Sequence, residues 1–511
     1  MMAKVISGAT VGLESVPVEV EVNIEHRGFP AFNIVGLPDK AVEEAKERVR
    51  SALKNSSAEF PARRITVNLA PADLPKKGPA YDLPIALGIL LADEQLQADV
   101  SDSLILGELS LDGHLRHTPG VLPMALLAKE KGFKKTFLPK INAKEAAIVD
   151  GIEVMPVKSI VALFDHFSKI RPIVAQPYTN FEELLGEDED YGFDLADVAG
   201  QEQAKRVLEI AAAGGHNILM KGPPGAGKTL LARTIPSILP RLTAAEALEV
   251  TKIYSITGNL PPNEPLIKHR PFRSPHHTTS RIGLIGGGSH PQPGEISLAH
   301  RGVLFLDEFP EFPRHVLESL RQPMEDGIVT VSRAAGTLSF PAKFILVAAQ
   351  NPCPCGFRGD PKRRCVCTQS QIIRYQKRVS GPILDRIDLH VEVPAVKHEQ
   401  LSADSSRLSA EDSKTVRARI QEARERQQKR FAETSLTCNA EMTAKNIKKY
   451  CQLDLKEQNF LRQAAVQMNL SARAYHRILK VARTIADLAG TQNIKTSHLA
   501  EALQYRPPVE V

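Results

Sequence analysis

The chain has 511 residues, of which 42% are hydrophobic and 24% are charged, as in ordinary globular proteins. This length exceeds what a single hydrophobic core usually holds, so roughly two to four domains are expected. The formal net charge is only +6, which permits a nucleic-acid partner without arguing for one. No apolar run is long enough to span a membrane, and the N-terminus lacks a signal-peptide core. We therefore expect a cytoplasmic protein with no membrane partner.

The first 168 residues alternate short strand patterns with amphipathic segments. VEVEVNI at 18–24 alternates as a strand does, and apolar residues recur near helical spacing in DKAVEEAKERVRSALKN at 39–55. A stretch at 169–192 contains prolines and an acidic run, which indicates a linker. The order of these patterns predicts a domain at 1–168 followed by the linker.

A glycine-rich loop, GPPGAGKT at 222–229, separates a strand-like run at 216–221 from a helix-like run at 229–239. In such a loop the backbone N–H groups face the phosphates of ATP, the lysine neutralises their charge, and the threonine hydroxyl ligates Mg²⁺. Because strand, loop and helix follow in this order, a chance glycine-rich loop is the weaker interpretation. The expected nucleotide-binding residues are Gly222, Pro223, Pro224, Gly225, Ala226, Gly227, Lys228, Thr229 and Leu230.

Two later strand patterns end in polar residues that can complete an ATPase site. RGVLFLDEF at 301–309 ends in Asp307, which would hold Mg²⁺, and Glu308, which would polarise the attacking water. KFILVAAQNP at 343–352 places Asn351 at a strand tip, where it could orient that water. The alternatives are an acidic turn and an ordinary turn before proline. The loop at 222–229 favours the catalytic interpretation.

An arginine lies between two aspartates in ILDRIDLHVEV at 383–393. Arg386 at this position can stabilise transition-state charge in the site of a neighbouring subunit. The alternative is a local pair with Asp385 or Asp388. After a polar stretch at 397–410, the segment 411–431 predicts a helix of alternating charge, which is typical of a solvated face with salt bridges.

Four of the six cysteines lie close together, at Cys353, Cys355, Cys365 and Cys367. Four thiolates in two Cys-x-Cys pairs can build a closed tetrahedral zinc site. Free or redox-active thiols are the alternative, because Cys-x-Cys is tighter than the usual spacing. With zinc bound, the intervening loop would present basic side chains to a phosphate backbone: Arg358, Lys362, Arg363 and Arg364.

Together these motifs resemble the magnesium-chelatase-like branch of AAA+ ATPases, and nearly the whole chain resembles the bacterial ComM/YifB family. The matching segments lie at 197–229, 272–280 (FRSPHHTTS), 304–308 (LFLDE) and 348–356 (AAQNPCPCG). The resemblance implies an α/β fold with an AAA+ P-loop core at 193–396, which includes the cysteine loop at 353–367. A linker with a charged insertion helix at 397–432 and a helical lid at 433–511 would follow.

The resemblance also implies roles for individual residues. Lys228 and Thr229 would be the Walker A residues, and Asp307 and Glu308 the Walker B pair. Asn351 would be sensor 1, Arg386 a trans-acting arginine finger, and Arg473 the sensor 2 arginine, although Arg473 could equally be a solvated charge. Val198 and Gly200 match the segment that lines the adenine pocket.

An arginine finger acts across a subunit boundary, so the resemblance implies a hexameric ring. Neighbouring helicase rings carry two pore insertions, which here would be the loop at 272–295, with His276, His277 and Arg281, and the hairpin at 327–341, with Arg333 at its tip. The family's activity implies a DNA helicase that drives branch migration during natural transformation. ATP and Mg²⁺ would be its cofactors, and branched or single-stranded DNA and other recombination proteins its partners.

Two other interpretations remain open on the sequence. One is a protein-remodelling ATPase, either chelatase-like or chaperone-like, and the other is a regulatory ATPase paired with a separate protease. The polar and basic pore segments favour DNA, because a protein unfoldase usually carries aromatic residues there. No integrin-like metal domain follows the lid, which argues against a chelatase.

Residues 65–140 resemble the Lon-protease-like fold, an α+β domain of the ribosomal S5 domain 2 type. In this resemblance the positions of the catalytic serine and lysine are occupied by Ala80 and Met124. A Ser–Lys mechanism needs a hydroxyl nucleophile and an amine base within hydrogen-bond reach. Since neither group is present, we expect no peptidase activity, and a role in assembly or DNA engagement instead.

Overall fold

The computed structural model describes residues 2–25, 29–56, 58–185, 191–261, 264–288, 291–333, 336–360, 363–395 and 411–506. The chain folds into two compact units. Unit 1 comprises Met1–Gly186 and Ala244–Lys268, and unit 2 comprises Glu187–Thr243 and His269–Val511. Among the described residues, no helix has both the length and the apolar character needed to cross a membrane.

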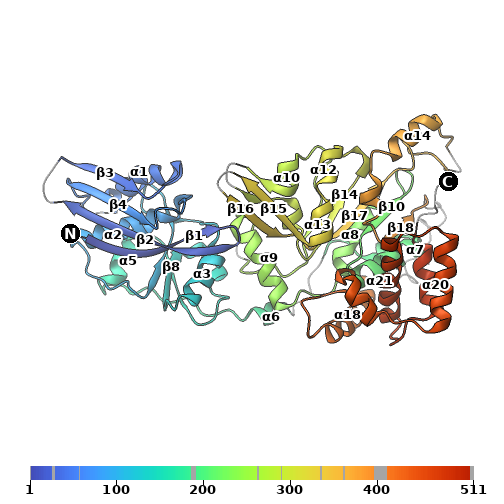
Figure 1. Cartoon of the computed structure of the whole chain (residues 1–511). Coiled ribbons are helices and arrows are strands. Elements are labelled where there is room, and N and C mark those ends of the chain that lie inside the picture. Colours follow the sequence, from blue (N-terminus) through green and yellow to red (C-terminus); the bar gives the residue numbers. More distant parts are fainter. Residues whose placement is uncertain are drawn as a thin grey trace. The chain divides into compact units, whose positions relative to one another are not determined.

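Unit 1 is built on a seven-stranded mixed sheet with the order β3-β4-β2-β1-β5-β8-β9 (Figure 1). β1 and β2 form an antiparallel hairpin, and β4 adds to β2 in the antiparallel sense, while the other pairs are parallel. Val18, Val20 and Val22 on β2 are fully buried, which confirms the strand predicted at 18–24. The strands are β1 (Met2–Val11), β2 (Glu14–Glu25), β3 (Ala31–Val35), β4 (Arg64–Ala70), β5 (Ser103–Ile105), β8 (Lys135–Pro139) and β9 (Glu153–Val157).

Two apolar helices cover opposite faces of this sheet. A Cβ on Gly88 of α2 (Asp82–Ala92) would lie 2.5 Å from Val22 Cγ2 and 3.8 Å from Val5 Cγ2. A Cβ on Gly8 would instead meet Leu127 and Met124 of α3 (Val121–Glu130) at 3.5 Å. Residues 5 and 8 of one strand point to opposite faces, so the two helices do too.

The helix predicted at 39–55 is confirmed as α1 (Lys40–Asn55). It begins at Asp39, whose carboxylate accepts the Val42 N–H at 2.8 Å, and it packs on α2. The remaining elements of unit 1 are α4 (Ala143–Ala146), α5 (Ile160–Phe167), α6 (Phe181–Leu185) and the paired strands β6 (Glu108–Leu109) and β7 (Leu115–Arg116).

One helix departs from the predicted organisation. The sequence predicts a continuous core at 193–396, but α9 (Ala244–Ile256) packs beside α3 and belongs to unit 1. The Gly120 N–H donates to the Ser255 carbonyl at 2.9 Å, and the Ser255 hydroxyl lies 2.5 Å from the Glu145 carboxylate. Burial raises the pKa of Glu145. A carboxylate that is buried needs hydrogen-bond donors to its oxygens, and the Ser255 hydroxyl is one of them. The core is therefore interrupted by a segment of the other unit.

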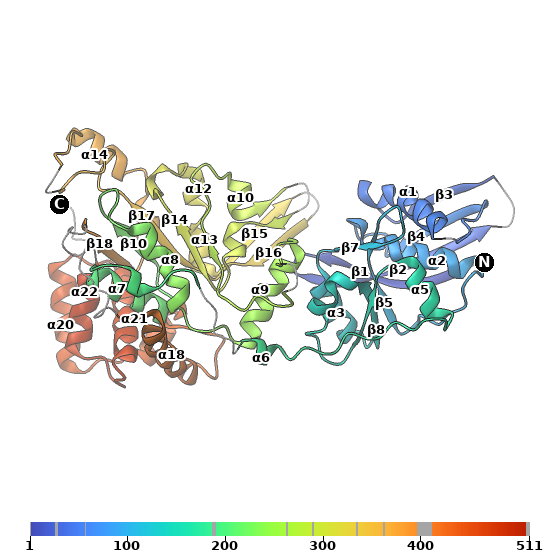
Figure 2. The same cartoon turned by 180° about the vertical axis from the view of Figure 1, so that it is seen from behind.

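Unit 2 contains a five-stranded parallel sheet with the order β11-β14-β17-β10-β18. Its inner strands are nearly continuous apolar runs, as expected for a parallel sheet covered on both faces. Figure 2 shows α7 (Glu202–Gly214) and α8 (Lys228–Ile238) in green beside this sheet. The strands are β10 (Ile218–Lys221), β11 (Phe272–Arg273), β14 (Val303–Leu306), β17 (Ile345–Gln350) and β18 (Leu389–Glu392).

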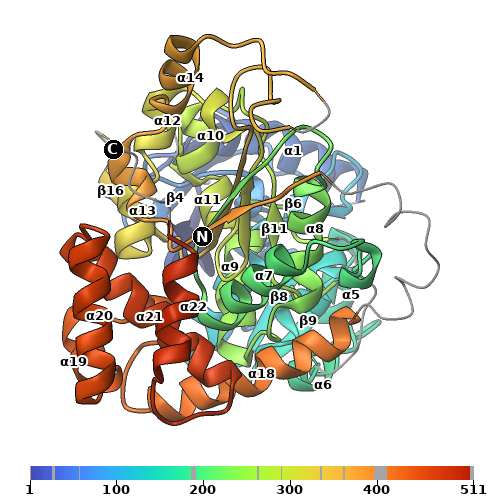
Figure 3. The same cartoon turned by 90° about the vertical axis from the view of Figure 1, so that its right-hand side faces the viewer.

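The C-terminal helices share one hydrophobic cluster with the sheet and with α7 and α8. Figure 3 shows α19 to α22 side by side in red, next to α18 in orange. The prediction of a solvated charged helix at 411–431 holds for only one face of α18: Val416 and Ile420 are buried, and Arg424 donates to the Ala212 carbonyl at 2.9 Å. The polar stretch predicted at 397–410 lies outside the described residues. The C-terminal helices are α18 (Ser413–Arg430), α19 (Ala444–Tyr450), α20 (Leu455–Gln467), α21 (Ala472–Leu488) and α22 (Thr496–Gln504).

The hairpin predicted at 327–341 is confirmed as β15 (Ile328–Arg333) and β16 (Gly336–Pro341). The other elements of unit 2 are the helices α10 (Arg281–Ile285), α11 (Glu295–Leu298), α12 (Arg314–Glu318), α13 (Arg321–Asp326), α14 (Gln369–Gln376) and α15 (Gly381–Leu384), and the paired strands β12 (Gly286–Gly287) and β13 (Gln292–Pro293).

Candidate nucleotide site

The loop at 222–227 connects β10 to α8, whose first residue is Lys228. Gly227 caps the helix with a φ of 85°, a left-handed conformation that glycine adopts without a steric cost. The start of α8 therefore faces the loop, and the first N–H groups of a helix have no acceptor within their own helix, as in sites that bind phosphate. The predicted order of strand, loop and helix is confirmed.

Lys228 connects this loop to the strand that carries Asn351. Its Nζ lies 2.8 Å from the carbonyl oxygens of Gly222 and Pro223 and 3.2 Å from Asn351 Oδ1. Burial lowers the pKa of Lys228, and the nearby Asp307 carboxylate acts in the opposite direction. The structure thus brings together the predicted lysine and the predicted polar residue at the tip of β17.

Thr229 and Asp307 provide the oxygen atoms expected of a Mg²⁺ site. Thr229 Oγ1 donates to Asp307 Oδ2 at 2.8 Å, across from the end of β14. Hydroxyl and carboxylate oxygens are ligands that suit Mg²⁺, so this donor set fits the metal. Glu308 follows with a φ of 50°, a conformation that is rare for a residue with a side chain and is common at functional sites.

The segment at 198–201 lies against the phosphate loop. Val198 is buried in the same cluster as Ala226, and Leu230 packs against that cluster. Gln201 Nε2 lies 3.4 Å from the Ala226 carbonyl and 2.6 Å from the Pro394 carbonyl. The sequence predicted roles for Val198 and Gly200 but not for Gln201. The left-handed φ of 61° at Gln201 could not be inferred from the residue pattern.

Arg386 and Arg473 meet on a single carboxylate, that of Glu325 on α13. Arg386 forms an ion pair with Glu325 and donates to the Pro382 carbonyl at 2.7 Å, while Arg473 Nη2 lies 3.5 Å from Glu325 Oε1. The hydrogen bond from Arg386 lowers the pKa of Glu325. In the described contacts, neither guanidinium is bonded to the loop at 222–229 of its own chain. The acidic pair Glu325–Asp326 before the hairpin gave no signal in the sequence.

The alternative of a local pair between Arg386 and Asp388 is wrong. Asp388 Oδ1 lies 2.5 Å from Arg477 Nη1, and its Oδ2 lies 3.4 Å from His216 Nδ1. Burial alone would raise the pKa of Asp388, but the Arg477 and His216 side chains outweigh it, and the pKa lies well below its ordinary value. Asp388 therefore binds α21 to the sheet through Arg477, while Arg386 pairs with Glu325.

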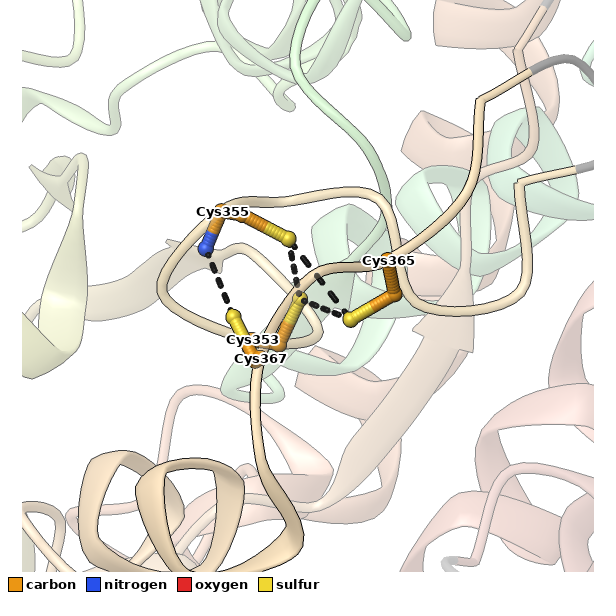
Figure 4. Close-up of side chains that lie close together, drawn as sticks. All are labelled: Cys353, Cys355, Cys365 and Cys367. Atoms are coloured by element: carbon orange, nitrogen blue, oxygen red, sulfur yellow. Dashed lines mark hydrogen bonds between the residues drawn. The ribbon is translucent and has the colours of Figure 1, made fainter.

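The four clustered cysteines converge from two stretches of one loop (Figure 4). The Cys353 sulfur lies 3.4 Å from that of Cys355 and 3.7 Å from that of Cys365, and the four ligand atoms all lie within 4.8 Å of one another. The Phe357 backbone N–H, followed by that of Val366, lowers the pKa of Cys355 to about 6. The spacing predicted that the four sulfurs meet, and the geometry confirms it.

The cysteine loop also touches the phosphate loop. Gly356 has a φ of 82°, and a Cβ at this position would lie 2.5 Å from Pro224 Cδ. Only a residue without a side chain leaves room for the Pro224 ring at this distance. Because Asn351 precedes the same loop, the cysteines lie next to two parts of the nucleotide site.

The candidate DNA contacts occupy two described regions. Two hydrogen bonds of 2.7 and 2.8 Å between Arg273 and Glu295 join the ends of the loop at 272–295. Within this loop, His276 and Arg281 are exposed. His277 Nδ1 lies 3.3 Å from Glu308 Oε2. In the cysteine loop, Arg358, Arg363 and Arg364 are exposed. Lys362, the hairpin tip and the side chain of Arg333 lie outside the described residues.

Comparison with known proteins covers almost the entire chain. The family model described as magnesium chelatase, subunit ChlI, matches residues 194–401. A model described as subunit ChlI of Mg-chelatase matches residues 20–142, and one described as magnesium chelatase, subunit ChlI C-terminal, matches residues 410–506. Competence protein ComM of Haemophilus influenzae is 45% identical over 511 residues, which cover 100% of this chain and 98% of that protein. YifB of Escherichia coli is 44% identical over 98% of this chain and 96% of its own length.

A more distant relative shares only part of the chain. The magnesium-chelatase 38 kDa subunit of Cereibacter sphaeroides is 25% identical over 176 residues, which cover 31% of this chain and 53% of that protein. The full-length matches and the three family models indicate one family, and the contact between the phosphate loop and Asp307 is consistent with it. The chain belongs to the ComM/YifB family of magnesium-chelatase-like AAA+ proteins.

Proposed function

We propose that this chain is a cytoplasmic, ATP-driven DNA motor that acts as a hexameric ring and promotes branch migration during natural transformation and recombination. The observation that carries the ATPase is the contact of Lys228 with Asn351 and of Thr229 with Asp307. The name of the relative in Haemophilus influenzae assigns that protein to competence, which supports a role for this chain in DNA handling. Other recombination proteins are candidate partners.

In the proposed reaction, Thr229 and Asp307 would hold Mg²⁺, which neutralises the charge that develops on the transferred phosphoryl group. Lys228 would neutralise the β- and γ-phosphates. Glu308 would accept a proton from the attacking water at its carboxylate, and Asn351 would orient that water. Arg386, with Arg473 beside it on Glu325, would stabilise charge in the site of the neighbouring subunit.

The segments beside the site favour DNA over a protein chain as the substrate. Exposed side chains near Glu308 are imidazoles and a guanidinium, at His276 and Arg281, and the cysteine loop exposes three arginines. Such groups suit a phosphate backbone, whereas an apolar polypeptide would be gripped by aromatic side chains. Arg281 is the candidate contact that can be tested most directly.

We expect single-stranded or forked DNA to stimulate ATP hydrolysis, with binding that weakens as salt rises. Replacing Arg281 by Ala should remove about one phosphate contact and reduce the salt slope of binding by about one. Fluorescence anisotropy at several salt concentrations measures this slope. Lys429→Ala, in the last turn of α18, is the matched control and should leave the slope unchanged.

Protein remodelling is the second candidate function, because the family models carry the description of a magnesium-chelatase subunit. An enzyme that hydrolyses ATP without any DNA stimulation or salt-dependent DNA binding would favour this candidate and overturn the DNA motor. Displacement of strands at a fork would separate a helicase from a passive DNA binder.

For unit 1 we propose a Lon-protease-like fold without peptidase activity. The positions that would hold the serine and lysine are Ala80 and Met124, which are 7% and 3% exposed and therefore face the interior. Neither side chain can act as a nucleophile or a base. A role in assembly or in holding DNA fits this unit better than proteolysis.

We further propose that the cysteine cluster binds structural zinc. A tetrahedral site with Zn–S bonds of about 2.3 Å places its sulfurs about 3.8 Å apart. The three separations among Cys353, Cys355 and Cys365 are 3.4, 3.7 and 3.6 Å, close to that value. Four thiolates at this distance repel one another without a cation. The metal would fix the loop that touches Pro224 and follows Asn351.

A Cys353→Ser/Cys365→Ser variant is expected to lose about one zinc per chain, since two serines cannot complete the tetrahedral site. ATP turnover should fall with it, because Gly356 loses its fixed position against Pro224. Metal analysis of purified protein measures the first effect. Cys438→Ser, which changes a buried thiol far from the cluster in sequence, is the control. Equal, near-zero zinc in the wild type and the double variant would refute the proposal.

A further inference from the structure

Asn217 lies directly before β10, at the end of that strand opposite the phosphate loop. β10 pairs in parallel with β17 on one side and with β18 on the other, and Ile218 is opposite both Val347 and Leu389. Asn217 is therefore placed between the start of β17 and the start of β18. Because β10 has four residues, this point lies about 13 Å along the strand from the phosphate loop.

The side chain of Asn217 joins two segments that are distant in sequence. Its Oδ1 accepts the Leu346 N–H of β17 at 2.8 Å, and its Nδ2 donates to the Arg386 carbonyl at 3.2 Å. These partners fix the orientation of the amide, because a backbone N–H can only donate and a carbonyl can only accept. The amide thus connects the segment that carries Arg386 to a central strand of the sheet.

The main chain of Asn217 bonds to the residues that follow Arg386. The Asn217 carbonyl accepts the N–H groups of Asp388 and Leu389 at 3.1 and 3.0 Å, and the Asn217 N–H donates to Asp388 Oδ2 at 3.2 Å. Arg477 binds the other oxygen of the same carboxylate. These bonds fix the start of β18, but they do not reach Arg386, which lies two residues earlier.

The main chain of Arg386 has few other attachments. Its N–H donates to the Ile383 carbonyl at 2.9 Å, and its guanidinium donates to the Pro382 carbonyl at 2.7 Å, both within the same turn. The ion pair with Glu325 restrains the tip of the side chain. Among the described residues, the Asn217 amide is the one group outside this turn that bonds to the Arg386 main chain. Without that bond, the turn that carries Arg386 is free to shift.

We propose that Asn217 is a positioning residue for Arg386, and that it acts on ATP hydrolysis in the neighbouring subunit. This role rests on the trans-acting function proposed for Arg386 and does not depend on DNA. A guanidinium that must meet a phosphoryl group across a subunit boundary needs a fixed main chain, since a small misplacement of a catalytic group lowers the rate. The alternative is a role in its own subunit, through the bond to β17, the strand that leads to Asn351.

Variants of the full-length protein separate the two bonds of the amide. Asn217→Ala should lose about three- to tenfold in kcat for ATP, the effect of one neutral hydrogen bond, with an unchanged KM. Asn217→Asp keeps the acceptor for Leu346 but removes the donor to Arg386, so its kcat should fall at least as much. Wild-type kcat in either variant would overturn the proposal. Asn68→Ala, which removes a half-buried amide bonded to Glu21 in unit 1, is the matched control and should keep wild-type kcat.

Two mixtures of subunits decide whether Asn217 acts in its own site or in the next one. Lys228→Ala subunits have little turnover but an intact Arg386. Mixed with Asn217→Ala, they should raise the ATPase rate per chain above the average of the two separate rates, weighted by the mixing ratio. Arg386→Ala subunits lack the guanidinium, so mixing them with Asn217→Ala should give that weighted average. An excess with Arg386→Ala would instead show that Asn217 supports its own site, and the proposal would be wrong.

A third mixture, Arg386→Ala with Lys228→Ala, tests the role of Arg386 itself. If this mixture shows an excess and Asn217→Ala with Lys228→Ala does not, the proposal for Asn217 fails while the trans-acting arginine stands. If neither mixture shows an excess, both fail together. Should Asn217→Ala unfold at a lower temperature than the wild type, Asn217→Asp, which keeps the bond from β17, decides by the same mixtures.

Discussion

A Glu308→Gln variant is expected to bind ATP as the wild type does and to lose turnover by a factor of about 10² to 10⁴, the usual effect of removing a general base. The amide cannot accept a proton from water, whereas the residues that would bind the phosphates and Mg²⁺, Lys228, Thr229 and Asp307, keep their contacts. Steady-state kcat and the Kd of a fluorescent ATP analogue measure the two effects separately.

Glu311→Gln is the matched control for this variant. Glu311 lies in the same acidic turn, but its carboxylate pairs with Arg378 and not with the nucleotide site. It should retain wild-type turnover because an exposed ion pair contributes little to stability. If both variants lost turnover equally, or if Glu308→Gln kept most of it, Glu308 would not be the general base.

An Arg386→Ala variant should lose turnover by about 10³, the lower end of the range for an arginine finger, when every subunit carries the change. Mixed with Lys228→Ala subunits, it should recover part of that activity. In the proposed ring, mixing would create intact nucleotide sites that face an intact Arg386 from the next subunit. ATPase rates across a series of mixing ratios measure the recovery.

The ion pair with Glu325 provides the control for this second prediction. Glu325→Gln removes the partner of Arg386 and leaves the guanidinium in place. If Arg386 serves only to pair with Glu325, both variants should lose the same turnover and mixing should restore nothing. A loss confined to Arg386→Ala, with recovery on mixing, would place the guanidinium in the neighbouring site.

Much of the nucleotide site could be predicted because its signals are local in sequence. Glycines that permit left-handed turns, apolar runs that end in carboxylates, and a lysine at a helix start each depend on a few adjacent residues. The cysteine cluster could also be predicted from local sequence, because two Cys-x-Cys pairs in one short loop lie close together in space. Lys228, Thr229, Asp307 and Asn351 accordingly lie together.

The missed features depend on contacts between segments distant in sequence. Glu325 attracts Arg386 and Arg473 only because α13, α15 and α21 converge, and no residue pattern records that. Likewise, α9 has an ordinary helical sequence, and its packing beside α3 and the contact of Ser255 with the buried Glu145 carboxylate join residues that are distant in sequence. The pairing of His277 with Glu308 required the adjacency of β11 and β14.

The position of α9 also changes how the two units are linked. The chain crosses between them after Gly186, after Thr243 and again after Lys268. Truncation before the phosphate loop would also leave Val250 and Ile253, both buried in the intact chain, without their apolar partners. Unit 2 is thus not separable from unit 1 by one cut, and unit 1 is a discontinuous domain that includes a helix from between two segments of unit 2.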